Sequence, residues 1–181
     1  HMEEFARSPR AARRMGDRTD IHGRRADGSL FDAEASISHV ELDGALFFAA
    51  ILRDVSESRE AARAVARSVC AEMHSGFVAL RTHLPMDLAH DQALADTPAD
   101  ALADIERIVA LWSQCRTRFG ADGAFLFGHA SIADAFYAPV AARLRSYRVE
   151  LPPLVAEYVA TIYQWPAFQR WRQAALEESA W

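Results

Sequence analysis

The spacing of apolar residues changes character near residue 56. Before that point, residues 30–42 alternate: Phe31, Ala33, Ala35 and Ile37 fall on one face and polar residues fall on the other. This period of two is typical of a half-buried β-strand. Residues 45–53 are apolar on both faces, which favours a strand that is covered on both sides. With turn signals at Asp-Gly pairs, the pattern predicts a three-stranded antiparallel meander over 19–26, 30–41 and 45–54.

From Ser56 the apolar residues recur every three or four positions, which predicts helices to the end of the chain. The first helix should run from Ser56 until Pro85 stops it, about 40 Å at 1.5 Å per residue. Residues 86–97 read as a loop. Further helices should begin at a Thr97-Pro98 start, at Ser131, at Pro152-Pro153 and at Pro166, with a kink at Pro139 in the second of them.

Together these elements predict an α+β fold. A short Arg- and Ala-rich helix over residues 3–15 precedes the three strands, and a long helix joins the sheet to an all-helical bundle. The organisation expected is a sheet segment over 1–56 and a helical domain over 57–181.

Composition adds few constraints. With 181 residues, 51% hydrophobic and a net charge of −5, the chain suits one compact domain or two small ones and excludes a disordered polypeptide. No run of about 18 apolar residues indicates a membrane span. Every basic residue is Arg, which we interpret as codon bias and which removes lysine chemistry. The isolated Cys70 and Cys115 form neither a zinc motif nor a disulfide framework, so we expect a cytoplasmic protein.

Two strings give the helical half a family resemblance. Ala66-Arg67-Ser68-Val69-Cys70-Ala71-Glu72-Met73-His74-Ser75-Gly76-Phe77 and Phe125-Leu126-Phe127-Gly128-His129-Ala130-Ser131-Ile132-Ala133-Asp134-Ala135-Phe136-Tyr137-Ala138-Pro139-Val140 resemble the C-terminal helical domain of bacterial glutathione S-transferases, over residues 59–181. The second string matches the N-capping box of that domain's core helix. The resemblance implies structural roles for Ser131 and Asp134.

Residues 5–58 resemble a different family, the C-terminal part of a PAS sensor domain. The strings Gly23-Arg24-Arg25-Ala26-Asp27-Gly28-Ser29-Leu30-Phe31 and Ile51-Leu52-Arg53-Asp54-Val55-Ser56-Glu57 carry this resemblance. It covers about half of such a domain, without its first two strands or most of its ligand-embracing helices. The chain therefore resembles half of one family joined to half of another, a chimera that is either engineered or selected.

The resemblances imply no complete active site. Glutathione S-transferases bind glutathione on a thioredoxin-like domain, and nothing before residue 59 resembles one, so we expect no catalytic residues. A hydrophobic-ligand pocket could be lined by the following residues, although core packing explains the same spacing: Met73, His74, Phe77, Trp112 and Tyr137.

The sequence also contains residues that could form a metal, haem or nucleic-acid site, but we expect none of these sites. His83, Asp87, His90 and Asp91 lie close in sequence but match no zinc motif, so no metal is expected. Neither His22 nor His39 lies on the helix that would supply a haem ligand, and no cofactor is expected. Seven Arg between residues 7 and 25 are interpreted as a solvated helix face and not as a nucleic-acid patch.

The expected strand over 45–54 lacks its usual partner, which leaves an apolar edge. We expect a homodimer in which this strand pairs with its symmetry mate to give a six-stranded sheet. The leading hypothesis is thus a non-catalytic fold without nucleic-acid or membrane partners. The alternatives are a glutathione S-transferase relative with weak activity or apolar-ligand binding, and a PAS-like ligand sensor.

Overall fold

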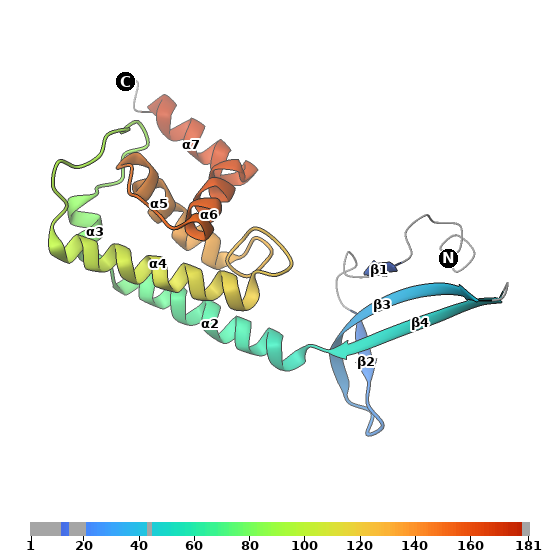
Figure 1. The fold of residues 1–181 in the computed structure, drawn as a ribbon. Coiled ribbons are helices and arrows are strands. Elements are labelled where there is room, and N and C mark those ends of the chain that lie inside the picture. The colour runs from blue at the N-terminus through green and yellow to red at the C-terminus, as the bar shows by residue number, and fades with distance from the viewer. Residues whose placement is uncertain (1–11, 15–20, 43–44, 179–181) are drawn as a thin grey trace. The chain divides into compact units, whose positions relative to one another are not determined.

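The computed structural model describes residues 12–14, 21–42 and 45–178, and divides the chain into two compact units, His1–Ala61 and Ala62–Trp181. The first unit is a sheet of β1 (Ala12–Arg14), β2 (His22–Arg24), β3 (Leu30–Leu42) and β4 (Ala45–Asp54). The second holds α2 (Ser56–Ser75, which begins before the boundary), α3 (Val78–His83), α4 (Ala99–Phe119), α5 (Ile132–Ser146), α6 (Pro153–Gln164) and α7 (Pro166–Glu178) (Figure 1). The predicted α+β class is confirmed.

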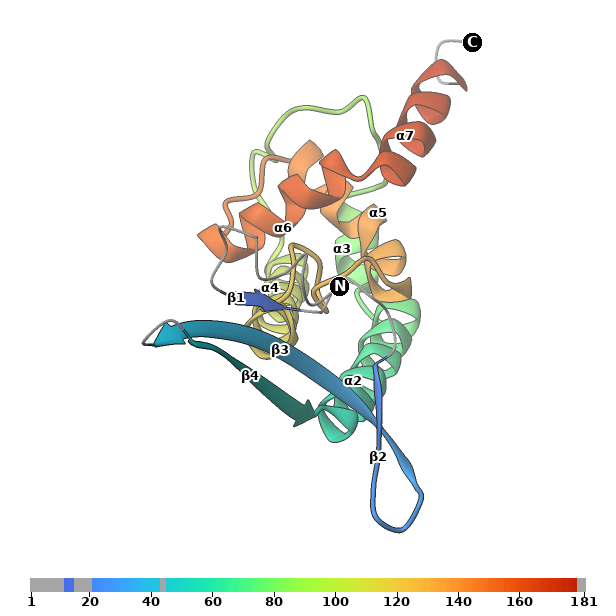
Figure 2. The ribbon, with the colours of Figure 1, turned by 90° about the vertical axis from the view of Figure 1, so that its right-hand side faces the viewer.

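The long strand β3 organises the sheet, and every pairing in it is antiparallel. β4 follows one edge of β3, while β1 and β2 occupy the other edge one after the other, so the sheet is three strands across (Figure 2). Ile37 shows this arrangement, because it pairs with Arg13 on one side and with Ala50 on the other. The strands predicted over 30–41 and 45–54 are present as β3 and β4, and they pair with each other antiparallel.

The helix predicted over residues 3–15 is wrong at Ala12–Arg14, which form β1; its remaining residues lie outside the described part of the chain. The run of Ala and Arg favours a helix locally. Pairing with Ser36–Ser38 of β3 overrides that preference, because it satisfies backbone groups on an edge that would otherwise stay open.

One end of the sheet is closed by a dense set of polar contacts. Gly28, at a φ of 87°, makes the turn between β2 and β3, and Arg25 forms an ion pair with Asp54 where β4 ends. The backbone N–H of Val55 donates to the Asp32 carbonyl, and the N–H of Asp32 donates to the Ser56 hydroxyl. The two PAS-resembling strings thus meet at the same end of β3.

The single helix predicted from Ser56 to Pro85 is wrong, since it is broken into α2 and α3. Phe77 adopts a left-handed conformation with a φ of 57°, which ends the helical hydrogen bonding after Gly76. Arg81 donates to the free carbonyls of Met73 and Gly76 at the end of α2. The Asp104 carboxylate of α4 accepts from the Leu80 N–H in the first turn of α3, at 2.9 Å. Arg81 and Asp104 thus satisfy backbone groups at the end of α2 and at the start of α3.

The other helix starts agree closely with prediction. α4 begins at Ala99 with Pro98 as the residue before it, so the hydroxyl of Thr97 is not the cap. α5, α6 and α7 begin directly at or after the predicted residues. Pro139 lies inside α5, and the predicted kink there stays a prediction.

Three large aromatic side chains form the centre of the helical unit. Trp112 of α4 is fully buried, with its ring edge-on to Tyr137 of α5 at 5.5 Å and to Tyr158 of α6 at 4.8 Å between centroids. Edge-to-face packing of this kind is favourable beyond the area it buries. This aromatic centre fixes the positions of α4, α5 and α6 relative to one another.

Candidate functional site

The five residues predicted to line an apolar pocket are divided between core and surface. Trp112 and Tyr137 are fully buried, and Phe77 is nearly so. The Tyr137 hydroxyl donates to the Val69 carbonyl at 3.0 Å, which ties α5 to α2. Met73 is half-buried against the core, and His74 is exposed.

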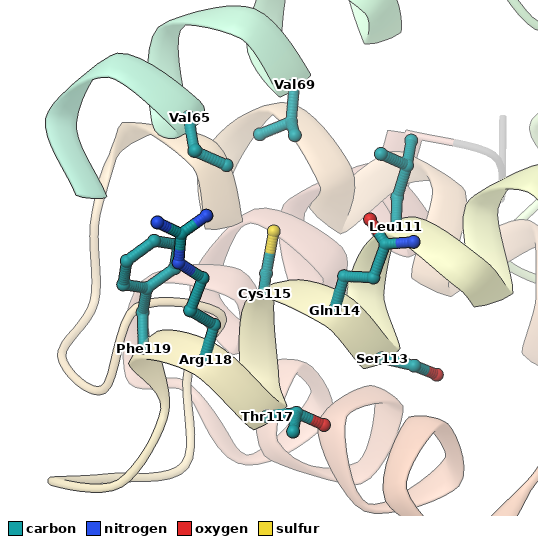
Figure 3. Close-up of a pocket in the computed structure, with 9 residues that line it drawn as sticks. All are labelled: Val65, Val69, Leu111, Ser113, Gln114, Cys115, Thr117, Arg118 and Phe119. Atoms are coloured by element: carbon teal, nitrogen blue, oxygen red, sulfur yellow. The ribbon is translucent and has the colours of Figure 1, made fainter. Parts of the chain in front are cut away.

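None of these five residues lines the groove found in the structure. It lies between α2 and α4, with a volume of about 530 Å³, within the range of small-molecule sites (Figure 3). Val65 and Val69 of α2 form one wall, and Leu111, Cys115 and Phe119 of α4 supply most of the apolar surface opposite. The rim is completed by residues of α4, three with neutral polar side chains and one cationic: Ser113, Gln114, Thr117 and Arg118.

The groove arises directly from helical periodicity. Val65 and Val69 are four residues apart on α2, as are Leu111, Cys115 and Phe119 in succession on α4, so each set occupies one face of its helix. In Figure 3 the sulfur of Cys115 points across the groove toward Val69. Beyond the groove, Arg107 of α4 donates two hydrogen bonds to the Glu72 carboxylate of α2, at 2.7 and 3.0 Å. This pair holds the two helices side by side.

The nucleophile-type side chains in this region are kept protonated. Burial raises the pKa of the Cys115 thiol to about 11, with a further contribution from the charge of Asp134. The pKa of Cys70 is raised by the same two causes. Burial likewise raises the pKa values of Tyr137 and Tyr158. Since the thiolate is the reactive form of cysteine, neither thiol is activated at neutral pH.

Asp134 is the most intensively bonded buried polar group described. Its carboxylate accepts from the Ser131 N–H and hydroxyl, both at 2.8 Å, from the Leu126 N–H at 3.1 Å and from the Tyr158 hydroxyl at 3.0 Å. Ser131 and Asp134 thereby form a capping box at the start of α5. Four donors on one fully buried carboxylate give Asp134 a structural role, because they leave it little capacity to act on a substrate.

The four residues considered for a metal are not brought together. The Asp91 carboxylate accepts two hydrogen bonds from Arg148, and the His83 ring lies 3.6 Å from Asp100. The His90 ring lies tilted against the Tyr147 ring, with 4.3 Å between centroids, while the backbone N–H groups of Ala89 and His90 donate to Asp87. Among the described residues, no group of three or more His, Cys, Asp or Glu side chains is arranged to hold a metal ion.

The groove was not predicted from the sequence. Its apolar lining residues recur at helical spacing, which predicts an apolar helix face but does not distinguish a groove from a core: Val65, Val69, Leu111, Cys115 and Phe119. The decisive feature is that helices α2 and α4 leave a gap on this side, which depends on tertiary packing. A signal in the sequence was the small Cys115 between Leu111 and Phe119 on the same helical face.

This all-helical domain, built around a buried capping box, has a family match. Residues 56–174 match the family described as Glutathione S-transferase, C-terminal domain, which covers well over half of the chain. The chain therefore belongs to that family. No curated protein matches its sequence. Within the described residues, no helix is both long enough and apolar enough to span a membrane.

Proposed function

We propose that the helical domain binds small apolar molecules in the groove between α2 and α4, without catalysing their conversion. The groove itself carries this proposal, because its volume and its wall of aliphatic, thiol and phenyl groups suit a ligand of one or two rings. The raised pKa values of Cys70, Cys115 and Tyr137 favour binding over catalysis, since each group is neutral near pH 7.

A neutral fluorescent probe, N-phenyl-1-naphthylamine, tests binding in the groove. Val65→Glu places a carboxylate on its wall and should weaken binding about tenfold, which corresponds to roughly 1.4 kcal/mol. Ala64→Glu is the matched control, because Ala64 is exposed on the same helix and does not line the groove. Equal affinity of the two variants and the unmodified protein would place the probe elsewhere.

The absence of catalysis has its own test. The protein should not be retained on immobilised glutathione and should not accelerate conjugation of glutathione to a chlorodinitrobenzene. Turnover above the uncatalysed rate at millimolar glutathione would replace this proposal with a transferase activity.

A second candidate function, homodimerisation through β4, is favoured by the exposure of its apolar side chains. Ile51 is 67% exposed and Leu52 is 58% exposed. The Val55 N–H donates to β3, and N–H directions alternate along a strand, so the N–H of Ala49 points toward β3 and that of Ala50 points away. A second copy could add its own β4 antiparallel to this outer side and give a sheet six strands across.

Two proline variants distinguish loss of the dimer from loss of the β3–β4 pair within one chain. Proline removes an N–H donor. Ala50→Pro should convert the dimer to a monomer in sedimentation while leaving the β3–β4 pair folded, whereas Ala49→Pro should disrupt the pair itself. A wild-type protein that is monomeric at all accessible concentrations would eliminate this function.

We also infer that the sheet segment derives from a PAS domain, which would make the chain a chimera. Support comes from the meeting of the two PAS-resembling strings at one end of β3, through the Arg25–Asp54 ion pair and the Asp32–Ser56 hydrogen bond. Sequencing the source DNA across codons 56–62 tests this origin. An uninterrupted reading frame in related genomes would favour a natural fusion, and a junction unique to this chain would favour a recombinant.

A further inference from the structure

Among the described residues that line the groove between α2 and α4, one has a charged side chain. Of the nine described lining residues, five are apolar or thiol, three are neutral and polar, and the ninth is Arg118. No carboxylate is among them. The electrostatic character of this groove is therefore set by a single guanidinium.

The Arg118 guanidinium contacts the Phe119 ring at the groove, and no carboxylate among the described residues pairs with it. Its Cζ atom lies 4.9 Å from the centroid of the Phe119 ring, a cation–π contact. Figure 3 shows the guanidinium in front of that ring, at the end of the groove where Val65 lies. Among the described residues, neither a carboxylate nor a carbonyl accepts a hydrogen bond from it. Stacking on a ring leaves the edge of the guanidinium plane free to bind an oxyanion through two hydrogen bonds.

We propose that the preferred ligands are amphipathic anions, with an aromatic or aliphatic body and one carboxylate or sulfonate group. This inference rests on the proposed function of the groove and adds the ligand class. The body would lie against Val65, Val69 and Leu111, and the anionic group would reach Arg118 at the rim. Because Arg118 is exposed to solvent, its attraction for the anion should be moderate and should fall with salt.

A pair of matched probes tests the ligand class. 1-Naphthoate and 1-naphthalenemethanol share the same ring system and differ mainly in charge. In calorimetric titrations at low salt, the wild-type protein should bind the anion about tenfold more tightly than the alcohol. Arg118→Gln should bring the two affinities together, and Arg118→Lys should restore part of the difference. Arg67→Gln is the control, since Arg67 is an exposed α2 arginine that does not line the groove.

The possible outcomes distinguish failure of the proposed preference for anions from failure of the proposed binding in the groove. Equal binding of both probes, unaffected by Arg118→Gln, would overturn the preference for anions and leave apolar binding in place. No saturable binding of either probe at millimolar concentration would overturn the proposed function. An equal loss of both probes in Arg118→Gln, with an unchanged melting temperature, would show that Arg118 shapes the groove and does not recognise charge.

Discussion

The helical unit and the sheet unit differ in how far they bury their apolar side chains. In the helical unit, Trp112, Tyr137 and Tyr158 are fully buried. Among residues 21–38 and 48–61, the part of the sheet unit whose side-chain burial is described, only Ala33 and Val55 are buried, while Ile51 and Leu52 of β4 are more than half exposed. Apolar residues are thus abundant in both units, but only one unit encloses them.

This difference follows from how each kind of element satisfies its backbone. A helix closes its own hydrogen bonds and needs neighbours only for one apolar face, so five or six helices of this length can enclose a core. A sheet three strands across has two faces and two edges to cover, and cannot cover them by itself. The comparison predicts that substitutions in the helical unit are costly and that equivalent ones in the sheet unit are not.

The largest effect is expected at Asp134. Asp134→Ala removes the acceptor for the Ser131 and Leu126 N–H groups and for two hydroxyls, and leaves buried donors unsatisfied. The free energy of unfolding should fall by about 3–5 kcal/mol, since each unsatisfied buried donor costs about 1–3 kcal/mol. Tryptophan fluorescence in urea measures this in the helical unit, because all four tryptophans lie beyond residue 111. A loss below about 1 kcal/mol would contradict the importance of this carboxylate.

Alkaline pH should act next most strongly, through Cys115. A buried thiol with a pKa raised to about 11 binds its proton more tightly in the folded state than in the unfolded state. Its contribution to stability is therefore complete below its ordinary pKa and is lost as the pH rises toward 11. The full loss should be about 2.7 kcal/mol, because the pKa lies about two units above its ordinary value and each unit corresponds to 1.36 kcal/mol. Urea unfolding at several pH values should show a smaller alkaline loss in Cys115→Ala; identical pH dependence would assign the effect to the tyrosines.

Arg81 provides a smaller test at the break between α2 and α3. Arg81→Met keeps much of the aliphatic stem and removes the donors to the Met73 and Gly76 carbonyls. We expect a loss of about 1–2 kcal/mol, within the range for hydrogen bonds from charged groups. Hydrogen exchange should quicken first in α3 and at the end of α2. Arg67→Met is the matched control on an exposed face of α2 and should leave exchange unchanged.

Local signals in the sequence predicted the order and type of most elements. The alternation over β3, the capping box before α5 and the proline that begins α7 are properties of a few neighbouring residues, so the sequence is enough to recognise them. The break at Phe77 was missed, because it is stabilised by Arg81 and by Asp104 of another helix. β1 was missed for the same kind of reason, since its strand conformation depends on pairing with β3.

The candidate site was less predictable than the fold. Apolar spacing selected Trp112 and Tyr137, which are the residues most suited to a core, and the structure buries them completely. Whether an apolar residue faces a core or a groove depends on the separation of two helices, which periodicity does not encode. The charge of Arg118 was visible in the sequence, but its meaning depends on its position beside Phe119.

The smallest expected effect provides the sharpest comparison of the two units. Ile108 of α4 is fully buried, while Ile51 of β4 is 67% exposed. Ile→Val at position 108 should lower the free energy of unfolding by about 1 kcal/mol, whereas the same change at position 51 should alter it by less than about 0.5 kcal/mol. Unfolding followed by circular dichroism at submicromolar protein measures both. If the cost at Ile51 instead rises with protein concentration, the side chain is covered by a second copy, as dimerisation through β4 requires. A cost that is equal at both positions and independent of concentration would mean that the sheet unit encloses Ile51 by itself, and the contrast between the units would be wrong.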